Sequence, residues 1–153
     1  MRWPNPEAHG GDQKEMPVRL VDDPPPLTFV DVPAEAEALT SVRRALADWA
    51  TLAGLPPRDV EDLVLASYEA MANVVDHAYQ LGQRGRFRLD AACTADLQVL
   101  VTVSDTGRWH PQPTDSSSHR GRGLPLIHQL AHHAEVHHDQ RGTTVRMGWR
   151  LPS

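Results

Sequence analysis

Apolar residues recur along this chain with two different spacings, which divide most of it into helices and strands. In residues 34–54 and again in residues 56–80 they recur every three or four positions, as on one side of an α-helix. In residues 86–91 and 97–103 apolar and polar residues alternate, as in strands with one buried face. The pattern predicts two helices followed by a hairpin of two strands.

Shorter patterns complete the prediction at both ends of the chain. Residues 27–32 form a strand closed by Pro33, and Pro56-Pro57 open the second helix, where proline is tolerated in the first turn. A third helix follows Gly121-Arg-Gly123, and the chain ends in a hairpin of residues 135–138 and 143–151. The apolar stripe of the third helix consists of Leu124, Ile127, Leu130, Ala131 and Ala134.

The order strand, helix, helix, strand, strand, helix, strand, strand predicts an α+β fold. We expect a two-layer α/β sandwich in which the helices pack on one face of a mixed, mostly antiparallel sheet. Residues 27–151 form one domain, and the chain of 153 residues is long enough for one core. Residues 1–26 hold six prolines and no apolar period, which predicts a flexible Pro-rich arm.

Composition excludes several classes of protein. A net charge of −5 with only 15 Lys and Arg residues argues against direct binding of nucleic acid. Cys93 is the only cysteine, so the chain has no disulfide framework and suits a reducing compartment. Neither a signal peptide nor a membrane-spanning apolar run is present, which predicts a soluble cytoplasmic protein.

The second helix carries an unusual polar stripe. Glu69, Asn73 and His77 recur every four residues, and the helical period places them opposite the predicted core. The neighbours of this stripe include Leu65, Ala66, Ala70 and Ala72 rather than long charged side chains. A carboxylate and an amide oxygen at this spacing suit a divalent cation and its phosphate ligand, whereas an incidental polar stripe is the plainer interpretation.

Asp105-Thr-Gly107 follows the strand of residues 97–103 and has two interpretations. Asp and Gly favour turns for backbone reasons alone. An ionised Asp is also an acceptor for an exocyclic amine such as adenine N6, and glycine lets a flat ring approach the backbone.

Gly121-Arg-Gly123 is a candidate phosphate-binding segment, because free N–H groups and the dipole at a helix start favour an anion. Arg108, Arg120 and Arg122 add positive charge nearby. A plain loop hinge explains the two glycines equally well, and the polar residues 108–120 are either a lid over phosphates or a simple connection.

Seven of the nine histidines lie between His110 and His138, which raises the hypothesis of a metal-binding protein. His128 and His132 are four residues apart in the predicted helix and could share one metal. No carboxylate or thiol at a suitable spacing supports them.

The order of these motifs resembles the Bergerat-fold ATP-binding domain of the GHKL superfamily. Glu69-x-x-x-Asn73-x-x-x-His77, Asp105-x-Gly107, Gly121-x-Gly123 and Gly142-Thr143-Thr144 follow one another as in that family. Within it, the chain looks like the anti-sigma-factor serine/threonine kinases. The resemblance covers about residues 27–151.

The resemblance also implies roles for individual residues. Asn73 would be the Mg²⁺ ligand, Glu69 the catalytic base, and Asp105 the acceptor for the adenine amine of ATP. His77 shares the helix face of Glu69 and Asn73. The other residues implied at the ATP site are Gly107 beside the ring, Gly121 and Gly123 at the phosphates, and Thr143 under the base.

The function implied by the resemblance is transfer of the ATP γ-phosphate to a serine or threonine of an anti-anti-sigma (STAS-type) partner, together with sequestration of a sigma factor. A homodimer is expected from the resemblance alone. Trp109 departs from the family, where a second glycine is common, so the contacts of the lid and of the base are expected to differ there. The alternative is a catalytically silent module that binds a nucleotide or a partner.

Overall fold

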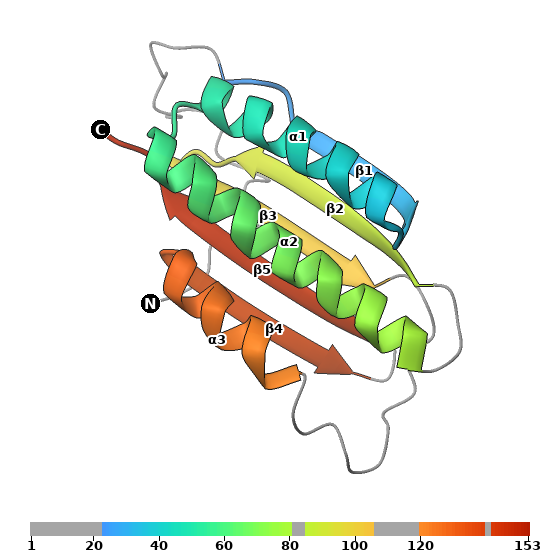
Figure 1. The fold of residues 1–153 in the computed structure, drawn as a ribbon. Helices are drawn as coiled ribbons and strands as arrows, with labels where there is room; N and C mark the ends of the chain where they lie inside the picture. The colour runs from blue at the N-terminus through green and yellow to red at the C-terminus, as the bar shows by residue number, and fades with distance from the viewer. Residues whose placement is uncertain (1–22, 81–84, 106–119, 140–141) are drawn as a thin grey trace, which may run out of the picture.

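The computed structural model describes residues 23–80, 85–105, 120–139 and 142–153 (Figure 1). Its helices and strands follow one another in the predicted order. They are β1 (Leu27–Pro33), α1 (Ala36–Ala53), α2 (Pro57–Gln80), β2 (Arg86–Cys93), β3 (Gln98–Asp105), α3 (Arg120–Leu130), β4 (His133–Asp139) and β5 (Gly142–Arg150).

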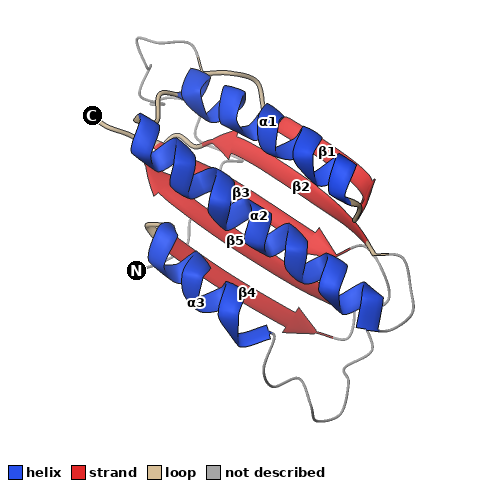
Figure 2. Ribbon diagram, in the orientation of Figure 1, coloured by secondary structure: helices blue, strands red, loops and turns tan. Residues whose placement is uncertain are grey.

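The five strands form one sheet in the order β1-β2-β3-β5-β4. Every neighbouring pair is antiparallel, so the predicted sandwich is confirmed but the expectation of a mixed sheet is wrong for the strands described. All three helices cover the same face of the sheet, with α2 between α1 and α3 (Figure 2). The other face carries no described helix.

The boundary between α1 and α2 follows from local chemistry. Gly54 adopts a left-handed conformation with φ of 101°, and its N–H bonds to the carbonyls of Ala50 and Thr51 at the end of α1. Glycine takes this conformation without the steric cost that a Cβ would bring. Pro57 then opens α2, at a position whose N–H has no partner within the helix.

The core lies between the helices and the covered face of the sheet. Alternate strand residues are buried there, while the helices contribute stripes that include Leu46, Leu63 and Met71. Because successive strand residues point to opposite faces, each strand contributes every second residue. The fully buried strand residues are Phe87, Leu89, Ala91, Val99, Val101, Val103, Met147 and Trp149.

Two indole groups bond to backbone carbonyls outside the regular ladders. Trp49 Nε1 donates to the Pro25 carbonyl over 2.7 Å, so the last residues of the predicted arm lie against α1. Trp149 Nε1 donates to the Leu130 carbonyl over 3.1 Å, at the last residue of α3. Residues 1–22 lie outside the described residues, and the arm as a whole stays a prediction.

The third helix differs from its prediction at both ends. It begins at Arg120, so Gly121 and Gly123 lie within its first turn rather than before it. It ends at Leu130, and Ala134, predicted on its stripe, belongs to β4 opposite Met147. The spacing of these apolar residues fits a helix locally, but pairing with β5 decides the conformation.

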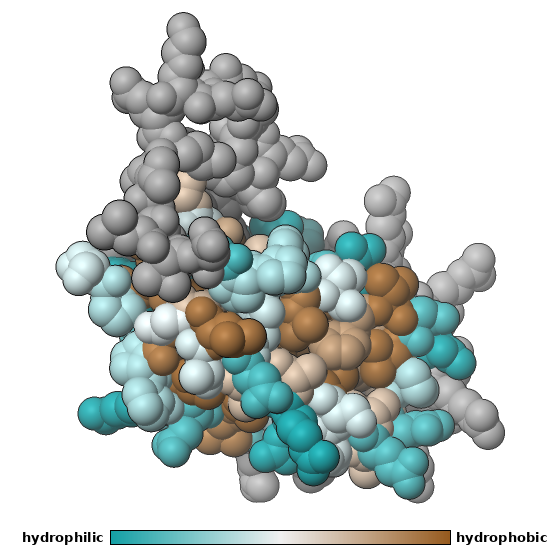
Figure 3. All heavy atoms as spheres, turned by 90° about the horizontal axis from the view of Figure 1, so that it is seen from above, coloured by the Kyte–Doolittle hydropathy of each residue, from teal (hydrophilic) through white to brown (hydrophobic). Residues whose placement is uncertain are grey.

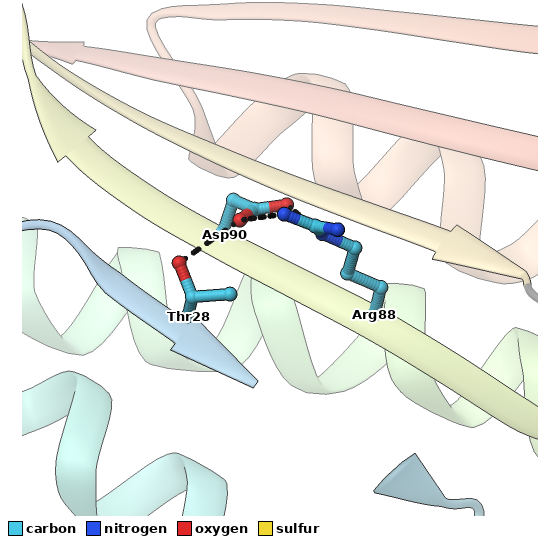
Figure 4. A network of polar contacts seen from close by, with 3 residues as sticks. All are labelled: Thr28, Arg88 and Asp90. Carbon is cyan, nitrogen blue, oxygen red and sulfur yellow. Dashed lines mark hydrogen bonds and ion pairs between the residues drawn. The ribbon is translucent and has the colours of Figure 1, made fainter. Parts of the chain in front are cut away.

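The uncovered face of the sheet is polar. Asp90 accepts hydrogen bonds from Thr28 Oγ1 on β1 over 3.1 Å and from Arg88 Nε over 2.8 Å (Figure 4). Large apolar side chains are exposed at few of the described positions, namely Val30, Leu52 and Leu65. Seen from above, apolar side chains gather in the middle of the molecule and polar ones along the lower rim (Figure 3).

Ser67 on α2 is fully buried, and its Oγ has no hydrogen-bond partner among the described residues. A buried hydroxyl without a partner costs free energy, so we expect Ser67→Ala to raise the free energy of unfolding by about 1 kcal/mol. Urea unfolding measures the change. The matched control is Ser41→Ala, at an exposed helical serine whose hydroxyl donates to the Glu37 carbonyl. This substitution should change the free energy of unfolding by less than about 0.5 kcal/mol. Equal effects of the two substitutions would contradict the interpretation.

Candidate functional site

The described candidate site residues come from four elements that meet at one end of the sheet. The C-terminal half of α2, the end of β3, the first turn of α3 and the start of β5 all lie at the lower right of Figure 1. The antiparallel pairing of β3 with β5 brings the last residue of one strand close to the first residues of the other. The fold therefore collects motifs that lie up to 74 residues apart in the sequence, from Glu69 to Thr143.

The polar stripe of α2 lies at the edge of the core rather than opposite it. Ala66 and Ala70, expected beside the stripe, are buried, whereas Glu69 and Asn73 are half-buried. The prediction placed the stripe too far from the core, because alanine fits a buried or an exposed position equally well. A half-buried carboxylate and amide are partly desolvated and still accessible, which suits binding of a charged ligand.

Asp59 marks the side of α2 that packs against α3. It lies in the first turn of α2, 3.9 Å from Nε2 of His132, which is two residues beyond the end of α3. Fourteen residues separate Asp59 from Asn73, which at about 100° per residue returns to within roughly 40° of the same side of the helix. Asn73 therefore lies on the side of α2 that packs against α3.

Asp105 and Thr143 lie together on the covered face of the sheet. The ladder between β3 and β5 extends to the pair Ser104 and Thr144, and Asp105 and Thr143 are the next residue of each strand. Asp105 has the same parity as the buried Val103, and Thr143 has the parity of the buried Val145. Both side chains are half-buried at the edge of the core. An acceptor and a hydroxyl at one position are suited to the polar edge of a flat heterocycle.

The first turn of α3 supplies backbone donors. Gly121 and Gly123 lie in this turn, and the first four N–H groups of a helix have no partner within the helix. They can bind an anion, as the sequence predicted. Pro125 lacks an N–H, so it removes a hydrogen bond that would hold the start of the helix together.

Part of the predicted site lies outside the described residues and side chains. Gly107 and Trp109 lie outside the described residues. His77 lies in α2, and the structure describes its backbone but not its side chain. Their predicted roles stay predictions.

The two histidines considered as a metal pair do not lie one turn apart on a helix. His128 lies on α3, but His132 lies beyond the end of that helix, so the two are not one turn apart on a helix face. Nδ1 of His132 instead accepts the backbone N–H of Arg150 over 2.8 Å. Within the described ranges, no group of three His, Cys, Asp or Glu side chains could hold a metal ion.

The adjacent His133 has a buried Nε2 without a hydrogen-bond partner in the described part of the chain. Burial lowers the pKa of His133, and the nearby Arg150 and His132 lower it further, so the ring is neutral at neutral pH. The contact of His132 with Asp59 and Arg150 was not predicted. No local sequence pattern could predict the contact between His132 and Asp59, because 73 residues separate them.

Comparisons with known proteins agree with the fold. The histidine kinase-like ATPase domain family matches residues 32–149. Serine-protein kinase RsbW of Bacillus velezensis is 33% identical over 129 residues, which are 76% of this chain and 80% of that protein. RsbW of Bacillus subtilis is 31% identical over 129 residues, with the same coverage.

A crystal structure of the RsbU and RsbW domains of a Mycobacterium tuberculosis protein aligns with a TM-score of 0.66 and 29% identity. The alignment covers 84% of this chain but only 33% of that longer chain. Because the family match spans most of the chain and the RsbW kinases align over most of their own length, this chain belongs to the histidine kinase-like ATPase domain family, among proteins of the RsbW anti-sigma-factor kinase type.

Proposed function

We propose that this protein is an ATP-dependent serine/threonine kinase that regulates a sigma factor. The observation that carries the proposal is that the C-terminal half of α2, the end of β3, the first turn of α3 and the start of β5 lie at one end of the sheet. The names of the RsbW relatives as serine-protein kinases support it. The role of each residue is part of the proposal.

In this proposal Asp105 and Thr143 hold the adenine, and the first turn of α3 binds the phosphates. The Asp105 carboxylate accepts a hydrogen bond from the adenine amine. The N–H groups of Gly121 and Gly123 donate to phosphate oxygens, with help from the helix dipole. Asn73 faces α3, so its amide oxygen lies on the side where these phosphates would bind.

The side chains on this side of α2 fit a bound Mg²⁺. Asn73 offers a neutral oxygen, which a hard cation accepts as a ligand alongside phosphate oxygens and water. Mg²⁺, when bound there with ATP, supplies neutralisation of the phosphate charge. Asn73 is half-buried, so its amide remains accessible to a ligand.

Glu69 lies one helical turn before Asn73 and acts as the general base. Its carboxylate accepts the proton of the incoming serine or threonine hydroxyl, whose oxygen forms a bond to the γ-phosphorus. The bond between the γ-phosphorus and the bridging oxygen of ADP breaks, and ADP leaves. Transfer of this kind depends mainly on positioning and on charge stabilisation, which these residues supply.

The acceptor in this proposal is a serine or threonine of an anti-anti-sigma partner of STAS type. Sequestration of a sigma factor is the second part of the proposed regulatory role. The described helices include none that is both long and apolar enough to cross a bilayer. We propose a cytoplasmic site of action, where ATP and a sigma factor are available.

Binding of MgATP should raise the thermal unfolding midpoint. At a ligand concentration about one hundred times the dissociation constant, a ligand of the native state adds about 2.7 kcal/mol, or roughly 5–10 °C for a chain of this size. Differential scanning fluorimetry of nucleotide-free protein measures the shift. Asp105→Asn should lose most of it, because the amide no longer provides an ionised acceptor for the adenine amine.

The matched control is Asp96→Asn, an exposed aspartate in the turn between β2 and β3, which should keep the full shift. A chain that is folded, free of nucleotide and unshifted by MgATP would refute the ATP site. A shift that Asp105→Asn retains would refute the role of Asp105 alone.

Replacing the proposed base should separate transfer from binding. We expect Glu69→Gln to lower the rate of γ-phosphate transfer about 10²–10⁴-fold, because general base catalysis is lost, while the MgATP-dependent shift persists. Labelled ATP and a purified STAS-domain protein that binds this chain provide the assay. Glu61→Gln, at an exposed position on the same helix, is the control and should keep the wild-type rate.

Undiminished transfer by Glu69→Gln would show that another group is the base. If the wild-type chain binds MgATP and the partner but transfers no phosphate, the protein is the silent binding module that the sequence left as the alternative.

A further inference from the structure

Hydrogen bonds fix the segment that links α3 to β4 to the end of β5. The Leu130 carbonyl accepts the Trp149 indole N–H over 3.1 Å, and the His132 N–H donates to the Gly148 carbonyl over 3.0 Å. A further bond runs from the Arg150 N–H to Nδ1 of His132 over 2.8 Å. Of these bonds, only the last uses an atom that gains and loses a proton near neutral pH.

The bond to Arg150 defines the protonation state of His132 in this structure. A backbone N–H can only donate, so Nδ1 of His132 must offer a lone pair. The ring is therefore neutral, and its one proton is on Nε2. Imidazole is the side chain whose charge ordinarily changes between about pH 5 and 8, and the proton that acid adds to this ring goes to Nδ1.

The other nitrogen of the same ring lies beside a carboxylate on α2. Nε2 of His132 is 3.9 Å from Oδ1 of Asp59, which is too long for a hydrogen bond but within the range of an ion pair. The Asp59 side chain is 20% exposed and the His132 side chain 36% exposed. Partial burial reduces screening by solvent, so a positive charge on the ring attracts Asp59 more strongly than it would at an open surface.

Protonation of Nδ1 is incompatible with the bond to Arg150. Two N–H groups would then face each other over 2.8 Å, and neither of them can accept a hydrogen bond. The ring must turn away from the Arg150 backbone, and the carboxylate of Asp59 is the acceptor on its other side. One proton thus removes a bond to β5 and favours a bond to α2.

We propose that His132 is a pH-sensitive switch, whose neutral ring bonds to the Arg150 backbone on β5 and whose protonated ring pairs with Asp59 on α2. The exchange releases one of the bonds that hold the connection between α3 and β4 to the sheet. It adds an ion pair between this connection and the start of α2. The attachment of α3 therefore depends on pH. The switch contains no residue of the proposed ATP site, so it does not rest on the proposed function.

Two further ionisable groups lie beside the switch, whereas the end of α3 contributes the uncharged Leu130. Arg150 carries a positive charge, which disfavours a second positive charge on a neighbouring ring. Burial lowers the pKa of His133, and Arg150 and His132 lower it further. Because the charged form of His133 is disfavoured in the native state, the free energy of unfolding falls as the pH drops below about 6.5, the ordinary pKa of histidine. A test of His132 must therefore measure a local bond rather than global stability.

NMR spectroscopy of the ¹⁵N-labelled full chain without nucleotide tests the switch. At about pH 8 we expect a scalar coupling across the hydrogen bond between the Arg150 nitrogen and Nδ1 of His132. At about pH 5.5 this coupling should be lost, while Nδ1 gains a proton. The matched control is the next amide, Leu151, whose N–H donates to the Leu97 carbonyl over 2.8 Å and should keep its protection from exchange. Because no nucleotide is present, failure of this test and failure of the proposed ATP site are distinguishable.

Two substitutions separate the two halves of the switch. His132→Asn places an amide oxygen close to the position of Nδ1, and this oxygen does not titrate, so the Arg150 amide should stay protected from exchange at both pH values. Asp59→Asn removes the anion that attracts the charged ring, so the bond to Arg150 should be lost only at lower pH than in the wild type. Glu61→Gln, at an exposed position on the same helix, is the matched control and should behave like the wild type.

A coupling that persists in the folded chain at about pH 5.5 would overturn the proposal. Simultaneous loss of the Arg150 and Leu151 bonds would also overturn it, because it would report unfolding of the strand end rather than an exchange of partners. If Asp59→Asn behaves like the wild type, or if His132→Asn still loses the protection of the Arg150 amide in acid, His132 does not switch between these two elements.

Discussion

Burial of one side of α2 is the interaction on which the remaining structure depends. Leu63, Ala66, Ala70 and Met71 are almost completely buried over the centre of the sheet, between α1 and α3. Burial of apolar area is the main driving force of folding, and α2 contributes to the core along most of its described length. Because the helix is held along its length, the polar residues at the margin of its buried side have little freedom to move. The packing of α2 against the sheet thus determines where the polar residues of the candidate site lie.

Sequence patterns were sufficient where local chemistry decides the structure. Gly54 and Pro57 mark a helix end and a helix start for backbone reasons that do not depend on the rest of the chain. The alternation in β2 and β3 was equally clear, since one face of each strand is buried and the other is polar. The order of the motifs then indicated the family, and the order of elements placed most site residues at one end of the sheet.

The predictions failed where residues that are distant in the sequence decide the local structure. The apolar residues from Leu124 to Ala134 have a helical spacing, yet the helix ends at Leu130, whose carbonyl accepts the Trp149 indole N–H, and Ala134 pairs with Met147. The helical period likewise gives the angular position of Glu69 and Asn73 around α2. It does not give the position of α3, and that position decides whether the two side chains face solvent or a neighbouring helix. Ala66 and Ala70 do not indicate which side of α2 is buried, because alanine is common at both buried and exposed positions.

The contacts at the far end of α3 have a mechanical consequence for the candidate site. There the Leu130 carbonyl is bound by Trp149, and His132 contacts both Asp59 on α2 and the backbone of Arg150. The first turn, with Gly121 and Gly123, lies at the opposite end of the helix and is weakened by Pro125. A helix fixed at one end and loosely bonded at the other responds to force by tilting about its fixed end. A tilt of α3 about this end would change the distance between the glycines and Asn73.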